Sequence, residues 1–355
     1  MKSQNPNPDF WRGRRVLVTG HSGFKGAWLS FWLARMGAIV SGVSLQPSTD
    51  PNLFSLLGLE PRLENNWLDI RDEQSVRGVF ERFQPEVVLH LAAQALVRPS
   101  YSAPIETFST NIIGTLHVLD AARKTASVRS IVAVTTDKVY QNHEKGLAFE
   151  ESDPLGGHDP YSASKAGAEM VISSYRKSFF ESACIGLASA RAGNVIGGGD
   201  WSVDRILPDA VRAWSSGQPL VVRNPRATRP WQHVLEPLAG YLCLAEHIFA
   251  QPQSAQDFNF GPDPSGVATV KEVVTKAQES FGGGNIEWGA LPDGLHEAQA
   301  LTLDNAKAKC LLGIYPVWNL EIAVALTMNW YRLQNSGQSA VDLCEQDIQA
   351  YLGAI

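Results

Sequence analysis

Short apolar runs alternate with amphipathic segments through the first half of the chain. Residues 15–19, 38–43, 87–91 and 131–134 are rich in Val, Ile and Leu, which is typical of strands buried on both faces of a parallel sheet. The segments between them carry apolar residues at helical spacing. This alternation predicts an α/β fold, a doubly wound parallel sheet of the Rossmann type with helical crossovers.

Further segments extend this pattern. Residues 26–36 predict a buried helix that ends at Gly37, and residues 183–190 predict the strand that closes the first run. Beyond them, residues 234–249 predict one long helix and residues 258–260 a short strand.

The character of the chain changes after Asn194, where glycines and prolines interrupt a loop-rich stretch with short helices. We therefore predict a first, cofactor-binding domain over residues 1–193, with residues 230–262 crossing back to it. Residues 194–355 are expected to form mainly a smaller, mixed α/β domain that binds the substrate.

Composition and charge narrow the function. The chain has 355 residues, 44% hydrophobic and 19% charged, with a formal net charge of -6, so we expect no nucleic-acid partner. Its most apolar stretch, residues 27–45, is broken by Arg35 and Gly37 and predicts no membrane span. Residues 1–9 are polar and predict no signal peptide. The four cysteines lie far apart, which predicts reduced thiols in a cytoplasmic protein and no metal site.

A glycine-rich turn follows the first predicted strand and opens the first long helix. It reads Gly20-His21-Ser22-Gly23-Phe24-Lys25-Gly26, with the spacing Gly-x-x-Gly-x-x-Gly. Glycines allow a tight turn and close backbone approach, and the free N–H groups of a helix N-terminus bind a pyrophosphate. The turn therefore predicts a dinucleotide site, in preference to a tight turn without a ligand.

Ionisable residues follow the strand 131–134. Thr136, Asp137 and Lys138 come directly after it, and Tyr161 and Lys165 lie four positions apart, on one face of a predicted helix. Ligands of open parallel sheets bind at the carboxyl ends of the strands. A Tyr–Lys pair alone also fits an amphipathic helix surface, but its place after the strand end favours an acid/base role. A lysine ammonium and a positive nicotinamide would lower the pKa of Tyr161 below its usual value near 10.

Together these motifs resemble the extended short-chain dehydrogenases/reductases, which bind a nicotinamide dinucleotide. The resemblance implies that the cofactor contacts the glycine turn, the pair after the third strand, the Leu-Ala-Ala loop, the asparagine helix and the catalytic strand and helix. The residues so implied are Gly20, Ser22, Gly23, Phe24, Lys25, Gly26, Asp69, Ile70, Leu91, Ala92, Ala93, Asn111, Thr135, Tyr161 and Lys165.

The second strand departs from the family pattern. It ends in Val43-Ser44-Leu45, where NAD-dependent relatives carry an acid for the adenosine ribose. Since no arginine cluster nearby suggests a 2′-phosphate, the sequence favours NAD over NADP, with a weaker hold on the ribose at Ser44.

The Thr136-Asp137-Lys138 triplet resembles the variant found in CDP-glucose 4,6-dehydratases. Related dehydratases carry Thr-Asp-Glu at these positions. A simple alcohol dehydrogenase or a 4-epimerase needs the Thr but not the acid/base residues at the two positions after it. The resemblance implies that Thr136 polarises the C4 oxygen and Tyr161 takes the 4-hydroxyl proton. Lys138 then removes the C5 proton, and Asp137 protonates the leaving 6-hydroxyl. Lys165 binds the ribose and tunes Tyr161.

Two blocks in the second half extend this resemblance, residues 191–201 and residues 229–237. They imply a CDP-glucose substrate whose diphosphate and sugar are held by residues from both halves. The substrate residues so implied are Gln94, Thr136, Asn194, Arg205 and Arg229. The family also implies a homodimer, or a dimer of dimers, formed through helices near 103–124 and 163–179, and a route to deoxy sugars of bacterial surface polysaccharide.

Two alternative functions remain open at this stage. One is another sugar-nucleotide enzyme of the same fold, such as a 4-epimerase or a dehydratase for a different nucleotide. The other is a non-catalytic dinucleotide sensor, which needs the glycine turn but not Asp137, Tyr161 or Lys165.

Overall fold

The fold is taken from a computed structural model of the chain. It describes residues 4–144, 146–263, 266–289 and 300–355, so the first three residues of the predicted first domain lie outside it.

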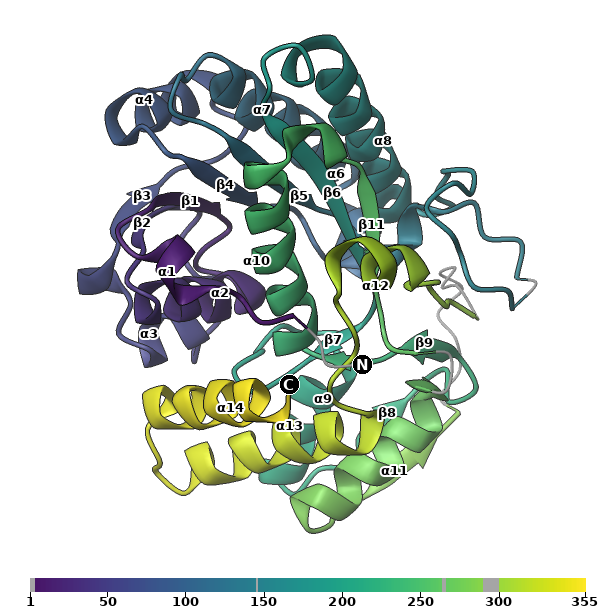
Figure 1. Cartoon of the computed structure of the whole chain (residues 1–355). Coiled ribbons are helices and arrows are strands. Elements are labelled where there is room, and N and C mark those ends of the chain that lie inside the picture. Colours follow the sequence, from purple (N-terminus) through teal and green to yellow (C-terminus); the bar gives the residue numbers. More distant parts are fainter. Residues whose placement is uncertain (1–3, 145, 264–265, 290–299) are drawn as a thin grey trace.

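A seven-stranded sheet forms the upper part of the molecule, as Figure 1 shows. Its order is β11-β6-β5-β4-β1-β2-β3, and every neighbouring pair is parallel. The strands are β1 (Arg15–Thr19), β2 (Ile39–Ser44), β3 (Glu64–Trp67), β4 (Val87–His90), β5 (Ser130–Val134), β6 (Gly186–Ala192) and β11 (Asp257–Phe260). The predicted Rossmann-type, doubly wound α/β sheet is confirmed.

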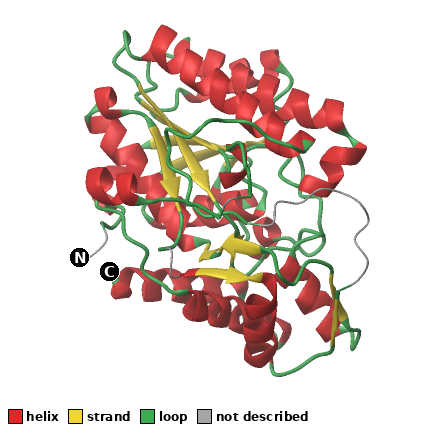
Figure 2. Cartoon of the chain, turned by 90° about the vertical axis from the view of Figure 1, so that its right-hand side faces the viewer, coloured by secondary structure: helices red, strands yellow, loops and turns green. Residues whose placement is uncertain are grey.

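Successive strand residues face opposite layers, because side chains alternate across a sheet. Val16 and Val18 pack into one core cluster, whereas Leu17 between them packs into another. The first cluster includes residues of α2 (Phe24–Arg35) and α10 (Leu235–Ala250). The second includes residues of α4 (Glu73–Phe83), α7 (Thr115–Arg123) and α8 (Pro160–Tyr175). Each face of the sheet is thus covered by helices (Figures 1 and 2).

Strand β6 begins three residues later than the sequence pattern predicts. Residues 183–185 precede Gly186 in a tight turn, where Cys184 has a φ of +54°. The turn is closed by backbone bonds from Cys184 N to Glu181 O and from Ile185 N to Phe180 O. An apolar run alone does not reveal this turn.

The second half of the chain forms a lower layer of helices and short strands (Figure 2). Its helices are α9 (Ile206–Ser215), α11 (Val270–Phe281), α13 (Leu320–Asn335) and α14 (Ala340–Ala354), whereas α12 (Ala306–Leu312) packs beside β11 and α10 (Figure 1). Its strands form three pairs: β7 (Val195–Ile196) with β10 (Gln232–His233), β8 (Leu220–Val222) with β13 (Ile286–Trp288), and β9 (Thr228–Pro230) with β12 (Val267–Thr269).

Segment 230–262 contributes to both layers. Its β10 pairs with β7, whereas α10 packs against the large sheet and β11 is one of the strands of that sheet. Residues of α10, α13 and α14 belong to one continuous core cluster. The division of the chain at residue 193 stays a prediction.

Short helices complete the fold: α1 (Pro8–Trp11), α3 (Leu53–Leu56), α5 (Val97–Ser102) and α6 (Pro104–Phe108). A π-helical turn, η2 (Ser109–Gly114), connects α6 to α7, and a 3₁₀ turn, η3 (Asp137–Val139), follows β5. In the described ranges, no helix has the length and apolar character needed to cross a membrane.

A buried carboxylate fastens the carboxy-terminal layer to α10. Glu236 accepts hydrogen bonds from Trp318 N at 2.7 Å, Val317 N at 3.1 Å and Tyr351 Oη at 3.2 Å. Burial raises the pKa of Glu236 to about 7, against the effect of these donors. One side chain thus joins α10 to the segment before α13 and to α14.

We expect Glu236→Ala to lower the free energy of unfolding by about 2–4 kcal/mol, because it leaves buried donors without an acceptor. Glu345→Ala is the matched control. Glu345 pairs with Arg35 at a partly exposed site, and such pairs contribute at most about 1 kcal/mol. Urea unfolding of both variants checks this prediction, and equal losses would contradict it.

Candidate active site

A cavity of about 1160 Å³ lies at the carboxyl ends of the central strands and extends to residues of the second half of the chain. All of the predicted site residues line it except Asn111 and Asp137, which lie just behind its wall. The parallel sheet brings these residues together, since its strands end at one edge.

The glycine turn is built for close backbone approach. Gly20 has a φ of +77°, and a Cβ there would lie 2.8 Å from the backbone nitrogen of Ala92. A Cβ on Gly26 would lie 1.9 Å from the carbonyl oxygen of Gly20. Helix α2 begins after Gly23 without a side-chain cap, and its first residues line the cavity, where the free N–H groups of a helix start suit an anionic group.

Serines take the place of the missing acid at the end of β2. Ser22 Oγ lies 2.7 Å from Ser44 Oγ and donates to the carbonyl oxygen of Leu45 at 2.8 Å. On the same side of the cavity, Asp69 accepts bonds from Arg71, whose guanidinium lowers the pKa of that carboxyl. Side-chain hydroxyls and Asp69 therefore line the part where the sequence predicts the adenosine.

Asn111 positions the loop that follows β4. Its Oδ1 accepts from Gln94 N at 2.9 Å, and its Nδ2 donates to Gln94 O at 3.0 Å and to Ser164 Oγ at 2.8 Å. The side chain is buried, so it joins the loop to α8 from behind rather than lining the cavity.

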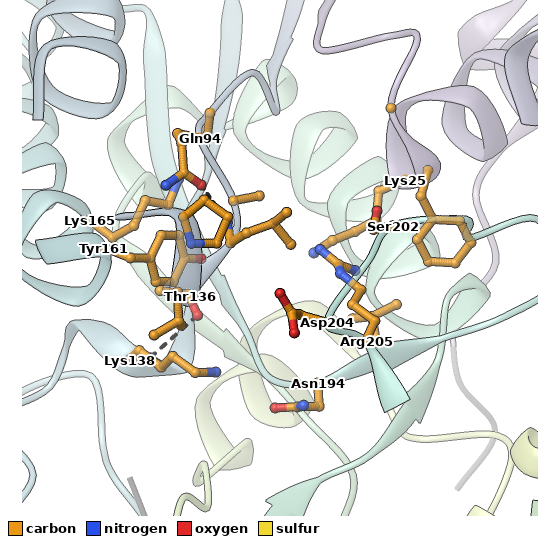
Figure 3. A pocket seen from close by; sticks show the side chains of 18 of the residues that line it. Lys25, Gln94, Thr136, Lys138, Tyr161, Lys165, Asn194, Ser202, Asp204 and Arg205 are labelled. Carbon is orange, nitrogen blue, oxygen red and sulfur yellow. Dashed lines mark hydrogen bonds between the residues drawn. The ribbon is translucent and has the colours of Figure 1, made fainter. Parts of the chain in front are cut away.

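The end of β5 supplies three polar residues in a row. Asp137 is fully buried, and its Oδ1 accepts from Thr136 Oγ1 at 2.9 Å and from Lys138 Nζ at 3.3 Å. Its Oδ2 has no hydrogen-bond partner among the described residues. Thr136 and Lys138 line the cavity in front of it (Figure 3).

Tyr161 and Lys165 face this strand end from α8 (Figure 3). The helix begins after Asp159, whose Oδ1 caps it by accepting from Ser162 N, and Pro160 fills its first position. Lys165 Nζ donates to the carbonyl oxygen of Val134 at 3.0 Å. The helix is therefore bonded to the strand that carries the polar triplet.

Burial controls the acid/base properties of the pair. It raises the pKa of Tyr161 to about 12, although a hydrogen bond with Thr136 lowers it. It lowers the pKa of Lys165 to about 8, against the raising effect of Glu169. The protein's side chains alone therefore do not give Tyr161 the pKa below 10 that the sequence suggests.

Lys25 adds another cation. Its Nζ donates to Tyr241 Oη at 3.4 Å, and burial lowers its pKa to about 7. The charges of Arg205 and Lys165 lower that pKa further. Basic side chains from both halves of the chain thus lie near one another in the cavity, and such groups suit a ligand that carries phosphates.

The second half supplies polar groups on the far side. Arg205 pairs with Asp200 at 3.0 Å, and Arg229 donates to the carbonyl oxygen of Thr228 at 2.8 Å. The buried Oδ1 of Asn194 has no hydrogen-bond partner among the described residues. All three predicted substrate residues from this half line the cavity.

Sequence reasoning missed residues that the fold brings to the site. Asp204 lies 3.5 Å from Arg98 and 3.4 Å from Arg223, and all three line the cavity. Glu169 lies four residues after Lys165, as Lys165 does after Tyr161. This repeated spacing places Glu169 on the same helix face and could have identified it from the sequence.

A doubly wound sheet, a glycine turn at its first helix and a Tyr–Lys pair beside β5 define an extended short-chain dehydrogenase/reductase. Residues 17–321 match the family described as GDP-mannose 4,6 dehydratase. The chain belongs to this family.

Individual relatives agree with this assignment. The chain is 43% identical to a CDP-glucose 4,6-dehydratase of Salmonella typhimurium, over 98% of each chain. It is 27% identical to a dTDP-glucose 4,6-dehydratase of Neisseria gonorrhoeae, over 90% of this chain and 95% of the relative.

Solved structures share the fold. A UDP-glucose 4-epimerase of Thermus thermophilus in complex with NAD superposes with a TM-score of 0.76 at 25% identity, covering 90% of this chain and 99% of its own. A dTDP-glucose 4,6-dehydratase of Bacillus anthracis in complex with NAD gives 0.75 at 22% identity, covering 93% and 100%.

Proposed function

We propose that this protein is an NAD-dependent CDP-glucose 4,6-dehydratase, which converts CDP-D-glucose to CDP-4-dehydro-6-deoxy-D-glucose with loss of water. The observation that carries the proposal is the Thr136-Asp137-Lys138 triplet at the end of β5, opposite Tyr161 and Lys165. A C4 oxidation alone needs only the hydroxyls and Lys165. The added acid and amine provide for a second proton transfer. The relative of Salmonella typhimurium supports the choice of substrate.

The cavity suits NAD. The turn from Gly20 to Gly26 leaves no room for a Cβ at its two ends, and the start of α2 offers N–H groups to a diphosphate. Asp69 and Ile70 border the part of the cavity proposed for the adenine, and Lys165 the part proposed for the nicotinamide ribose. When bound, NAD supplies reversible hydride transfer, first from the sugar C4 and finally to C6.

The first proton transfer involves the hydroxyl groups. Thr136 polarises the C4 oxygen, and Tyr161 accepts the 4-hydroxyl proton. Tyr161 has a pKa of about 12 in the protein alone, so its phenolate needs positive charge nearby. Lys165 supplies that charge from the same helix face and binds the ribose.

The elimination uses the two residues that follow. The ketone at C4 acidifies C5, and Lys138 removes the C5 proton. Asp137, behind the cavity wall, is the proton source for the leaving 6-hydroxyl, and its Oδ2 has no hydrogen-bond partner among the described residues. Lys138 Nζ lies 3.3 Å from Asp137 Oδ1, so the two side chains act as a pair. The amine of Lys138 gains the C5 proton, and the carboxyl of Asp137 gives up a proton to the leaving hydroxyl.

The substrate's diphosphate and sugar lie between the two layers. Asn194 and Arg229 hold the diphosphate, with Arg205 nearby, and guanidinium groups suit phosphate through charge-assisted hydrogen bonds. Gln94 and Thr136 contact the sugar from the sheet side. In this proposal residues 1–193, with α10 and β11, hold NAD, and residues 194–355 mainly hold the nucleotide. The protein acts in the cytoplasm.

To test the function, the purified protein is incubated with NAD and, separately, with CDP-, dTDP-, UDP- and GDP-linked glucose, and product mass is followed. We expect loss of one water from CDP-glucose alone. Dehydration of another nucleotide sugar would support the proposed reaction and contradict the proposed substrate. An unchanged mass with a new epimer would favour a 4-epimerase, and bound NAD with no turnover would favour a sensor.

Asp137→Asn separates elimination from oxidation. Because an amide cannot donate the carboxyl proton, we expect dehydration to fall at least about a hundredfold, whereas C4 oxidation slows less than about tenfold. Rapid-mixing absorbance of reduced nicotinamide follows oxidation, and product mass follows dehydration. Asp72→Asn, at the start of α4 outside the cavity, is the control. Equal losses in both steps would contradict the role of Asp137.

We also propose a homodimer. Apolar side chains are exposed on α6, η2 and α8, which pack beside one another: Ile105, Phe108, Ile113 and Met170, with Phe179 just beyond α8. Ile105 is 84% exposed and Met170 61%, which is unusual for such residues unless another surface covers them.

We expect Ile113→Glu combined with Met170→Glu to give a monomer in sedimentation velocity, because dimerisation would bury four charges. Ile322→Glu, on the exposed face of α13, should leave the dimer intact. A wild-type monomer would contradict the proposal.

A further inference from the structure

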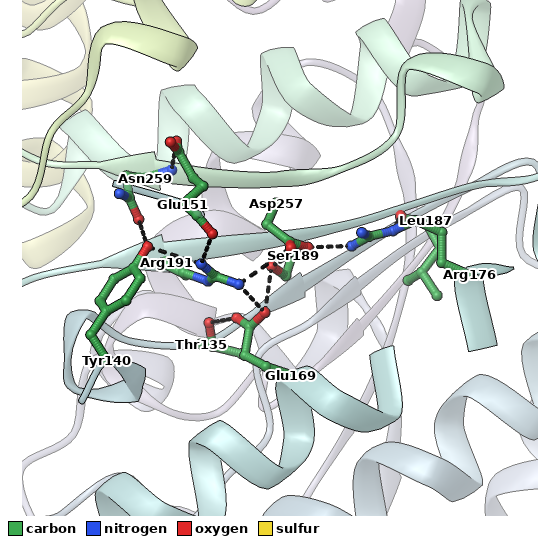
Figure 4. A network of polar contacts seen from close by, with 10 residues as sticks. All are labelled: Thr135, Tyr140, Glu151, Glu169, Arg176, Leu187, Ser189, Arg191, Asp257 and Asn259. Carbon is green, nitrogen blue, oxygen red and sulfur yellow. Dashed lines mark hydrogen bonds and ion pairs between the residues drawn. The ribbon is translucent and has the colours of Figure 1, made fainter. Parts of the chain in front are cut away.

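A buried carboxylate joins the catalytic helix to the catalytic strand. Glu169 is 2% exposed and lies one turn after Lys165 on α8. Its Oε1 accepts from the hydroxyl of Thr135, and its Oε2 accepts from Ser189 Oγ at 2.9 Å and from Arg191 Nη2 at 2.8 Å (Figure 4).

Thr135 directly precedes the polar triplet. Its side chain is turned to Glu169, so its hydroxyl is already committed although the residue borders the cavity. Lys165 makes the second bond between the same elements, to the carbonyl oxygen of Val134. The end of β5 is therefore held by two successive turns of α8.

Arg191 extends these contacts across the sheet. It is 2% exposed, lies 3.3 Å from Asp257 on β11, and donates to Tyr140 Oη at 2.9 Å and to the carbonyl oxygen of Glu151 at 3.1 Å. Figure 4 shows the resulting network, which continues from Asp257 to Arg176. Glu169 is thus bonded directly to β6, and Arg191 links it to β11 and to the loop after η3.

The charge of Glu169 matters because of what faces Lys165. Burial lowers the pKa of Lys25 on α2 and of His90 on β4, and the charge of Lys165 lowers both further. Tyr161 lies on the same face of α8. Glu169 raises the pKa of Lys165, which burial otherwise lowers. A contact that only holds α8 against β5 would need no charge, because apolar side chains of similar size stabilise buried elements as well as a buried ion pair does.

We propose that Glu169 is a positioning residue for the reaction: its carboxylate fixes α8 against the end of β5 and places a buried negative charge one helical turn from Lys165. This inference rests on the proposed function. Glu169 acts through Lys165 and Thr135 and touches neither substrate nor cofactor.

The negative charge of Glu169 predicts the direction in which its removal shifts the pH profile of activity. The ammonium form of Lys165 is the active one, so activity falls as pH rises through the pKa of Lys165. Removing the Glu169 charge lowers that pKa, so the alkaline limb of the pH profile moves to lower pH. A residue that only stabilises the fold lowers activity by one factor at every pH.

The test compares Glu169→Gln, which keeps the shape and loses the charge, with Ser189→Ala, which removes one bond to Glu169 and keeps the charge. For Glu169→Gln we expect kcat to fall at least about tenfold at pH 8.5 but less than about threefold at pH 6.5. For Ser189→Ala we expect one small loss at both pH values. Melting temperatures of both variants monitor folding, and Glu169→Asp, which keeps the charge, should restore most of the alkaline activity.

A second readout does not depend on turnover. The pH dependence of Lys165 acetylation by acetic anhydride, followed by peptide mass spectrometry, gives its midpoint in each variant. We expect a lower midpoint in Glu169→Gln only. An unshifted midpoint, or equal activity loss at both pH values, would overturn the inference. If the wild-type protein fails to dehydrate CDP-glucose, the proposed function fails, and the acetylation midpoint still tests the link between Glu169 and Lys165.

Discussion

The position of β5 between β4 and β6 is the constraint on which the site depends. Strand β5 is buried along its length, and its carboxyl end meets the cavity, which Thr136 and Lys138 line while Asp137 lies buried behind them. Helix α8 crosses that end and is bonded to it through Lys165 and Glu169. The proposed acid/base groups therefore come from two elements whose relative position is fixed by buried hydrogen bonds.

Burial also sets the electrostatics of the cavity. Desolvation lowers the pKa of Lys25 to about 7 and of Lys165 to about 8, so both amines titrate near neutral pH. It raises the pKa of Tyr161 to about 12. The same cause thus makes the lysines easier to deprotonate and the tyrosine harder. In the proposed reaction, the negative phosphates of cofactor and substrate raise the pKa of the lysines again, and the positive nicotinamide lowers the pKa of Tyr161.

The two layers of the molecule are joined by more than the chain connection. One apolar cluster runs from α2 and α10 into α13 and α14, and the Glu236 carboxylate adds directional bonds to it. Because the cavity lies between these layers, this joint sets the distance between the sheet-side residues and those around Arg205 and Arg229.

The sequence by itself determined the parts that depend on neighbours along the chain. Alternating apolar runs predicted the Rossmann-type sheet, and the Gly20–Gly26 turn and the Tyr161–Lys165 spacing predicted residues that line one cavity, because turns and helix faces follow local rules. Only the tertiary structure decided the rest. The burial of Asp137, the place of Asn111 behind the wall and the network of Glu169 with Arg191 and Asp257 depend on partners distant in sequence. Desolvation has the same origin: the pKa of Tyr161 depends on everything that excludes water from it, which no local pattern encodes.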